Sequence, residues 1–158
     1  MGAFLYLPIW LALAAGCPAE APAGTADDRD SLERTTRAIR DGFARGDVSA
    51  VVALHHPDVI KYFGGANVVK GRAAMEKGLS AMFKDSKVEF IDNRVESMLF
   101  QGETAVETSI FRMRVTSKAS GRSRISSGRA MVVYVRHKGS PTGWASIREM
   151  TQAAPTEE

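Results

Sequence analysis

The strongest constraint on the fold is the second half of the chain, where four long β-type segments follow one another. These segments cover residues 88–100, 104–117, 124–137 and 144–152 and are rich in Val, Ile, Met and Phe. The stretches between them, QGE, KASG and KGSPTG, consist of turn-forming residues. Long strands joined by short turns predict an antiparallel meander. The first segment changes the phase of its apolar alternation, so we expect a β-bulge there.

The residues before this meander are predicted to be mainly helical. Asp30, followed three residues later by a glutamate, predicts an N-cap, and apolar side chains then recur at helical spacing as far as Gly46. Asp47 predicts the cap of a second, short helix, which Pro57 is expected to end. A hairpin over residues 59–69 and a third helix complete this part. The expected fold class is α+β, with three N-terminal helices packed on a curved, mostly antiparallel sheet.

The N-terminus has the composition of an export signal. Residues 1–16 carry no charge and are almost wholly apolar, which suits a secretory signal better than a membrane span. The single cysteine, Cys17, follows in AAGC, which resembles a bacterial lipobox; a plain signal peptide cut nearby is the alternative. Residues 17–28 are Pro/Ala-rich and acidic, as in a flexible tether. We therefore expect a domain over 29–154, a tail over 155–158 and a lipid-anchored periplasmic protein, on the outer membrane if the host is Gram-negative.

The charge pattern does not favour a nucleic-acid partner. The 21 Lys and Arg residues exceed the 18 Asp and Glu residues only slightly, giving a net charge of +3. A basic cluster surrounds one predicted hairpin: Arg112, Arg114, Lys118, Arg122, Arg124 and Arg129. Aromatic residues that could stack on bases are not interleaved with it. The cluster is expected to be a solvated hairpin tip, or else a contact for anionic lipid or an acidic partner.

Three stretches resemble the nuclear transport factor 2-like (NTF2-like) superfamily, which includes the SnoaL-like and DUF4440 domains. They are GDVSAVVALHHPD, VVKGRAAMEKGLSAMF and RAMVVYVRHKGSPTGWASIREMTQ, and the likeness spans residues 29–153. The resemblance implies a cone-shaped domain with a pocket between the helices and the concave sheet. It also implies homodimers packed through the sheet. Because this fold hosts enzymes, ligand-binding proteins and assembly domains, it implies no particular reaction.

Polar side chains in apolar surroundings are the candidates to line such a pocket. Five residues fit this description: His55, Tyr62, Glu107, Tyr134 and Arg148. Neighbours on a strand face opposite ways, so only one of Arg148 and Glu149 can face the pocket. An inward arginine would favour ligands that carry a carboxylate or phosphate. Alternatively, Arg148 pairs with an inward carboxylate such as Glu107, or faces solvent.

Two kinds of chemistry are not expected. Ketosteroid isomerases need a carboxylate base and acidic oxyanion donors, but the matching positions hold Phe63 and a strand without an acid. His55 and His56 are adjacent and would point to different sides, so they cannot easily bind one metal ion. We expect neither a metal nor a cofactor.

Three functions remain open. The first is binding of a small, partly apolar ligand in the cone. The second is an enzyme of the SnoaL or dehydratase type, for which His55, Tyr62, Glu107 and Tyr134 are the candidate catalytic groups. At least two of these side chains should then converge in the pocket. The third is a dimerisation or assembly module that uses the outer face of the sheet.

Overall fold

The computed structural model describes residues 24–154, which form helices and a single sheet. In chain order the elements are α1 (Ala26–Arg45), α2 (Val48–Ala53), β1 (His55–Tyr62), β2 (Val68–Lys70), α3 (Gly71–Asp85), β3 (Ser86–Gln101), β4 (Thr104–Ser117), β5 (Ser123–Arg136) and β6 (Trp144–Ala153). The predicted export signal, Cys17 and the tail lie outside the described residues. Among those described, no helix is long and apolar enough to cross a membrane.

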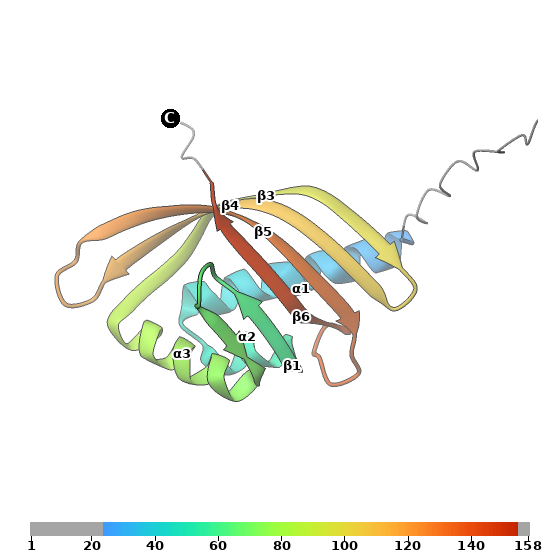
Figure 1. Cartoon of the computed structure of the whole chain (residues 1–158), viewed down its shortest axis with the longest axis horizontal. Coiled ribbons are helices and arrows are strands. Elements are labelled where there is room, and N and C mark those ends of the chain that lie inside the picture. The colour runs from blue at the N-terminus through green and yellow to red at the C-terminus, as the bar shows by residue number, and fades with distance from the viewer. Residues whose placement is uncertain (1–23, 155–158) are drawn as a thin grey trace, which may run out of the picture.

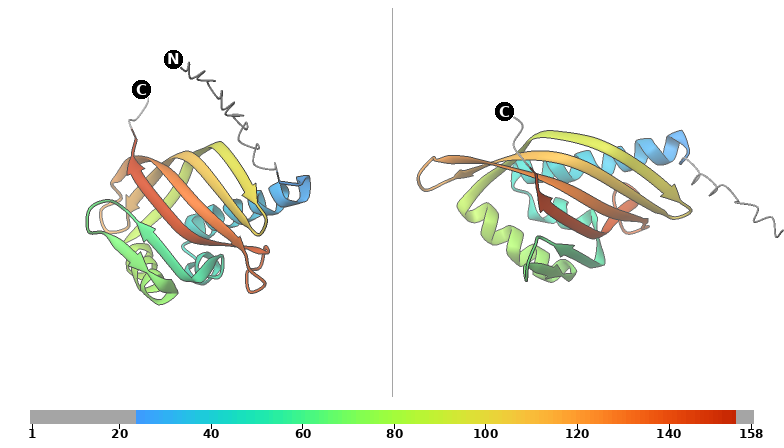
Figure 2. Two further views of the ribbon diagram at one scale, coloured as in Figure 1. Left: turned by 45° about the vertical axis from the view of Figure 1, so that its right-hand side comes forward. Right: turned by 45° about the horizontal axis from the view of Figure 1, so that its top comes forward.

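The six strands form one sheet in the order β2-β1-β6-β5-β4-β3. The predicted meander of β3 to β6 is confirmed, since each strand pairs antiparallel with the next. β1 is added to β6 in the parallel direction, so the sheet is mixed but mostly antiparallel. Figure 1 shows the sheet arching over α1, and Figure 2 shows the same curvature from two further sides. The fold is therefore α+β, with helices on the concave side of a curved sheet.

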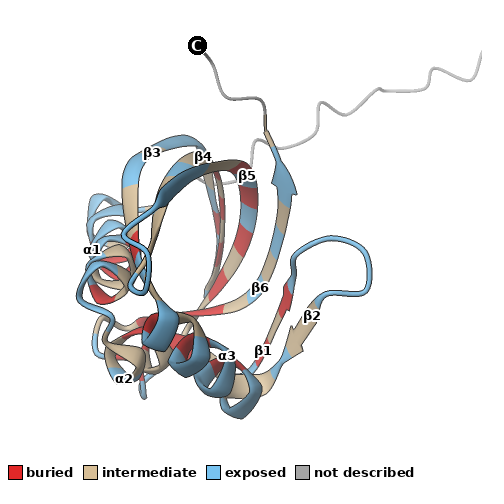
Figure 3. Cartoon of the chain, turned by 90° about the vertical axis from the view of Figure 1, so that its left-hand side faces the viewer, coloured by how far each residue is buried: buried red, intermediate tan, exposed pale blue. Residues whose placement is uncertain are grey.

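The apolar core consists of two clusters. One is built around Leu32 of α1, Phe100 and the fully buried Trp144 of β6. The other joins α2 and α3 to the start of the sheet and includes Met75 and Leu79. In Figure 3 the buried segments of α1 and α3 face the concave side of the sheet. Residues of both clusters line the space between the helices and the sheet.

The helix ends agree only in part with the sequence prediction. The N-cap of α1 is Thr25 rather than Asp30, because the Thr25 hydroxyl and the Asp28 carboxylate form a reciprocal capping box. Gly46 ends α1 as predicted, in the left-handed conformation with φ 66° that glycine adopts without strain. Asp47 caps α2 as predicted, by accepting a hydrogen bond from the backbone N–H of Ala50 at 3.0 Å.

The segment after α2 differs from the prediction. α2 ends at Ala53, and Pro57 lies within β1 instead of ending the helix. The parallel pairing with β6 begins at once, with Ser146 donating its backbone N–H to the Leu54 carbonyl. His55 therefore lies on a strand. The β-bulge expected in β3 is confirmed, since its pairing with β4 shifts at two places.

Candidate functional site

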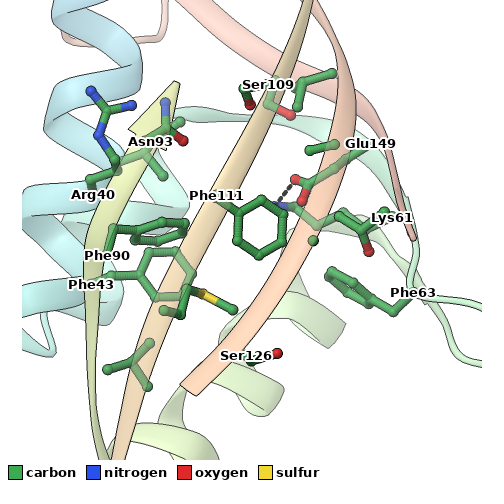
Figure 4. Close-up of a pocket in the computed structure, with 18 of the residues that line it drawn as sticks. Arg40, Phe43, Lys61, Phe63, Phe90, Asn93, Ser109, Phe111, Ser126 and Glu149 are labelled. Carbon is green, nitrogen blue, oxygen red and sulfur yellow. Dashed lines mark hydrogen bonds and ion pairs between the residues drawn. The ribbon is translucent and has the colours of Figure 1, made fainter. Parts of the chain in front are cut away.

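A cavity of about 880 Å³ lies between the helices and the concave face of the sheet. Pockets for small organic molecules have volumes of about 300–1,000 Å³. Phe43 of α1, Phe90 of β3 and Phe111 of β4 line one part of it, and their rings meet edge to face with centroids 5.6 and 5.9 Å apart. Figure 4 shows these three rings together. This part of the cavity is suited to an apolar or aromatic group.

The polar lining of the cavity follows the pairing of the strands. Tyr134 of β5 pairs with Ser146 of β6, which in turn pairs with His55 of β1; we call these residues the Tyr134 row. All three side chains are buried and line the cavity. The Ser146 hydroxyl has no hydrogen-bond partner among residues 24–154. The Tyr134 row therefore presents polar groups that a ligand could bond.

His55 offers a hydrogen-bond acceptor. Its Nδ1 lies 2.7 Å from the Val51 carbonyl oxygen, and since a carbonyl only accepts, Nδ1 carries the proton. Burial, reinforced by the positive charge of Lys61, lowers the pKa of His55 well below 6.5, so the ring is neutral. In this tautomer Nε2 has a free lone pair.

A second set of paired residues runs beside the first. Glu107 of β4 pairs with Val132, which pairs with Glu149 of β6, and Glu149 pairs with Lys61 of β1; we call these residues the Glu107 row. Lys61 Nζ lies 2.6 Å from Glu149 Oε2, and the two side chains are only 8% and 17% exposed. Figure 4 shows this ion pair beside the cavity. Lys61 and Glu149 thus neutralise each other.

Glu107 has no such partner. Its side chain is 3% exposed and lines the cavity, and Oε2 has no hydrogen-bond partner within residues 24–154. Burial raises the pKa of Glu107 to about 7, although the nearby Arg40 opposes this shift. Near neutral pH the carboxyl group is therefore present both with and without its proton, as a general acid or base requires.

Arg40 brings a positive charge to the cavity from α1. Its half-buried side chain forms no ion pair or hydrogen bond with any other residue between 24 and 154. Figure 4 shows it projecting from the helix on the side where Asn93 projects from β3. Sequence reasoning missed Arg40. A signal existed, because Arg40 lies four residues after Thr36 and three before Phe43, both on the inward stripe of α1.

The family model of the SnoaL-like domain matches residues 36–154, which is most of the chain. The chain belongs to the SnoaL-like domain family. This SnoaL-like domain has the NTF2-like fold. The fold family includes ligand-binding proteins and dehydratase-type enzymes. No curated protein matches the chain.

Solved structures resemble the SnoaL-like domain along nearly their whole length. A conserved protein from Planctomyces limnophilus is 16% identical with a TM-score of 0.72, over 80% of this chain and 98% of that one. A ketosteroid isomerase-like protein from Erwinia carotovora is 17% identical with a TM-score of 0.69, over 84% and 100%. An NTF2-like superfamily protein from Salmonella enterica is 12% identical with a TM-score of 0.67, over 84% and 96%. At these identities the likeness concerns the fold alone.

Three of the five residues singled out from the sequence line the cavity of the SnoaL-like domain, namely His55, Glu107 and Tyr134. Tyr62 and Arg148 do not. Tyr62 follows the inward Lys61 on β1, so it points to the opposite face, where it is 38% exposed. Arg148 is exposed and donates to the carbonyls of Asp58 and Ile147, at 2.9 and 2.7 Å. Of the alternatives for Arg148, the solvent-facing one is observed.

A bulge in β6 explains why Glu149 lines the cavity instead of Arg148. Tyr134 pairs with Ser146, but the preceding residue on β5, Val133, pairs with Arg148. Ile147 is thus left without a partner, and the alternation of side chains shifts by one residue. An uninterrupted strand would turn Ser146 and Arg148 to the same face.

The two adjacent histidines separate, as their spacing predicts. His55 lines the cavity, whereas the ring of His56 lies against His137 with centroids 5.0 Å apart. Within residues 24–154, no group of three or more His, Cys, Asp or Glu side chains could hold a metal ion.

Proposed function

We propose that this SnoaL-like domain binds a small, partly apolar organic ligand in its cavity. The observation that carries the proposal is the graded lining along β4. Its inward-facing residues change from Glu107 and Ser109 to Phe111 and Met113. Glu107 and Phe111 are four residues apart, which corresponds to about 13 Å along a strand. A ligand with a polar group at one end and an apolar body matches this gradient.

The polar end also has unused bonding capacity. Glu107 Oε2 and the Ser146 hydroxyl are buried and have no partner within residues 24–154. Buried polar atoms in folded proteins nearly always form hydrogen bonds, and leaving one unmade costs about 1–3 kcal/mol. A ligand with a hydroxyl, carbonyl or carboxyl group can form those bonds.

Mass spectrometry of the natively purified protein tests the proposal. A small organic molecule should co-purify with the wild-type chain and be lost from Ser126→Trp, which places a large ring in the cavity opposite Met113. Ile125→Trp is the matched control, because Ile125 precedes Ser126 on the same strand and its exposed side chain lies on the other face of the sheet. Equal retention of the molecule by both variants would refute binding in the cavity.

Glu107 favours a second candidate function, an enzyme of the SnoaL or dehydratase type. A carboxyl group with a pKa of about 7 can transfer protons at neutral pH, and it shares the cavity with His55 and Tyr134. Hydroxylated cyclic carbonyl compounds are suitable test substrates, with loss of one water followed by mass spectrometry. Turnover should disappear in Glu107→Gln and persist in Glu103→Gln, a control at an exposed carboxylate. Turnover that survives Glu107→Gln would exclude this role.

We further propose that the mature protein is anchored through a lipid on Cys17 and is extracytoplasmic. The apolar, uncharged segment before this single cysteine supports the proposal. In Cys17→Ser, the protein should move from the membrane fraction to the soluble fraction. Unchanged partitioning would rule the anchor out.

A homodimer through the outer face of the sheet is our proposal for the assembly. Leu99, Met131 and Met150 are exposed on this face, and Met131 pairs directly with Met150. Exposed apolar side chains grouped in this way are typical of protein contacts. Met131→Lys should convert a dimer into a monomer in sedimentation velocity. A wild-type monomer would refute the proposal.

A further inference from the structure

The charges that line the cavity do not compensate one another fully. Lys61 and Glu149 form a close ion pair. Glu107 keeps its proton more firmly than an exposed glutamate, because it is buried. Arg40 remains a full positive charge in the cavity lining, with no ion pair to any other residue from 24 to 154. The polar part of the cavity therefore has an excess of positive charge.

We propose that the ligand of this cavity is an organic monoacid, whose carboxylate binds the guanidinium of Arg40 while its apolar body lies against Phe43, Phe90 and Phe111. This inference rests on the proposed function, since it concerns the ligand of the same cavity. A carboxylate matches the fork of donors that a guanidinium presents and can accept two parallel hydrogen bonds from it. The arginine that the sequence placed on β6 is thus replaced in this role by one on α1.

The other charge classes fit less well. An ammonium group would be repelled by Arg40, which forms no ion pair with any other described residue. A doubly charged phosphate would lie near two carboxylates, Glu107 and Glu149, with Arg40 to balance it. Arg124 also lines the cavity, but it pairs with Val115, at the far end of β4 from Glu107. A neutral ligand would cover Arg40 and leave its charge without a partner, at a cost in affinity. A single negative charge balances the cavity.

The ligand and Glu107 then compete for the same positive charge. Two charged groups of α1, Arg40 and Glu33, act on Glu107. The other titratable groups near it are Lys61 and Glu149 in the Glu107 row, and Tyr134 and His55 in the Tyr134 row. Among these, Arg40 favours ionisation of Glu107. A carboxylate bound to Arg40 cancels that effect, so binding favours the protonated form of Glu107. Affinity for an acid should therefore fall as the pH rises above about 7, by up to about tenfold per pH unit.

Isothermal titration of the full chain with two matched pairs of probes tests this inference. The pairs are 2-naphthoate with 2-naphthamide and decanoate with decanamide, each an acid and its neutral amide. At pH 6 the acid should bind at least about tenfold more tightly than the amide, as expected for a charge-assisted hydrogen bond. At pH 8.5 this preference should shrink in the wild type and persist in Glu107→Gln.

Variants of α1 identify the group responsible. Arg40→Gln should abolish the preference for the acid, because the acid loses its charged partner and the amide no longer covers an unpaired charge. Arg40→Lys should retain part of the preference. Arg37→Gln is the matched control, because Arg37 lies one turn earlier on the same helix and is exposed. Melting temperatures close to the wild-type value would show that the variants are folded.

The outcomes separate this inference from the function on which it rests. Amides that bind as tightly as acids, or an acid preference that survives Arg40→Gln, would overturn the monoacid assignment and leave ligand binding intact. If neither acids nor amides bind to the wild-type chain, the proposed function itself is refuted. A pH dependence that persists in Glu107→Gln would show that another group takes up the proton.

Discussion

Replacing Glu107 by glutamine should stabilise the domain above pH 7. An accessible glutamate has a pKa of 4.5, and burial raises the pKa of Glu107 in the folded protein to about 7. Between these two values the folded state binds the proton that the unfolded state releases, so the free energy of unfolding falls as the pH rises. The difference between the two pKa values corresponds to about 3 kcal/mol of folding stability, which is fully present below pH 4.5 and lost above pH 7. Glutamine keeps the shape of the side chain and cannot ionise.

His55 contributes to the same pH range with the opposite sign. Burial lowers its pKa in the folded state well below 6.5, so its contribution to stability is complete above pH 6.5 and is lost as the pH falls. Because this contribution is present in both proteins, the difference between wild type and Glu107→Gln isolates Glu107. Any cost of burying the amide adds a constant that does not depend on pH.

Urea denaturation from pH 4.5 to pH 8.5 is the appropriate measurement, since it gives the free energy of unfolding at each pH. The stability of Glu107→Gln relative to wild type should rise by about 3 kcal/mol across this range and level off above pH 7. Glu103→Gln, at an exposed carboxylate, should parallel the wild type. Parallel pH profiles for wild type and Glu107→Gln would show that Glu107 ionises at its ordinary pKa, and the argument for acid–base chemistry would fail with it.

Two further predictions concern the walls of the cavity. Gly128→Ala should lower the free energy of unfolding by about 1–3 kcal/mol and alter the apolar end of the cavity, because the added Cβ would lie 2.5 Å from the ring of Phe111. Gly78→Ala should instead stabilise α3 by up to about 1 kcal/mol, because nothing lies within 4 Å of the added Cβ. Urea denaturation measures both changes. A loss of stability confined to Gly78→Ala would contradict this contrast. Lys61→Met should lower the free energy of unfolding by about 3 kcal/mol, because it leaves Glu149 without its counterion. Adding Glu149→Gln to the same chain should restore much of that stability. If the effects of the two substitutions are additive in a double-mutant cycle, the pairing is refuted.

The strands and their order along the chain could be predicted because local signals mark their ends. The prediction of residues 104–117 agrees with the bounds of β4, and Gly46 ends α1 as expected. Turn residues and a left-handed glycine act through the conformations they permit to the nearby backbone, so a short stretch of sequence contains the necessary information. The start of α1 was harder, since both Thr25 and Asp30 are good N-cap residues and only the capping box that forms distinguishes them.

The direction of each side chain was predictable only where the strands are regular. Glu107 and Tyr134 lie on β4 and β5, whose pairing with each other shows no register shift, and both line the cavity. The sequence makes Arg148 a candidate for the cavity because it is a polar residue in an apolar strand and only one of Arg148 and Glu149 can face inward, but the bulge at Ile147 turns it outward. A bulge is a property of the pairing between strands, and the sequence of β6 alone contains no signal for it.

The bulge also determines the electrostatics of the cavity. Without it, β6 would place Arg148 beside the inward Lys61 and turn Glu149 outward, so that two positive charges would adjoin in the lining. With it, Glu149 neutralises Lys61 at 2.6 Å. The net charge that a ligand meets then depends on Arg40, which α1 supplies from the other side of the cavity. The selectivity for an acid that we propose would therefore depend on one unpaired residue in β6, Ile147, together with Arg40 on the inward stripe of α1.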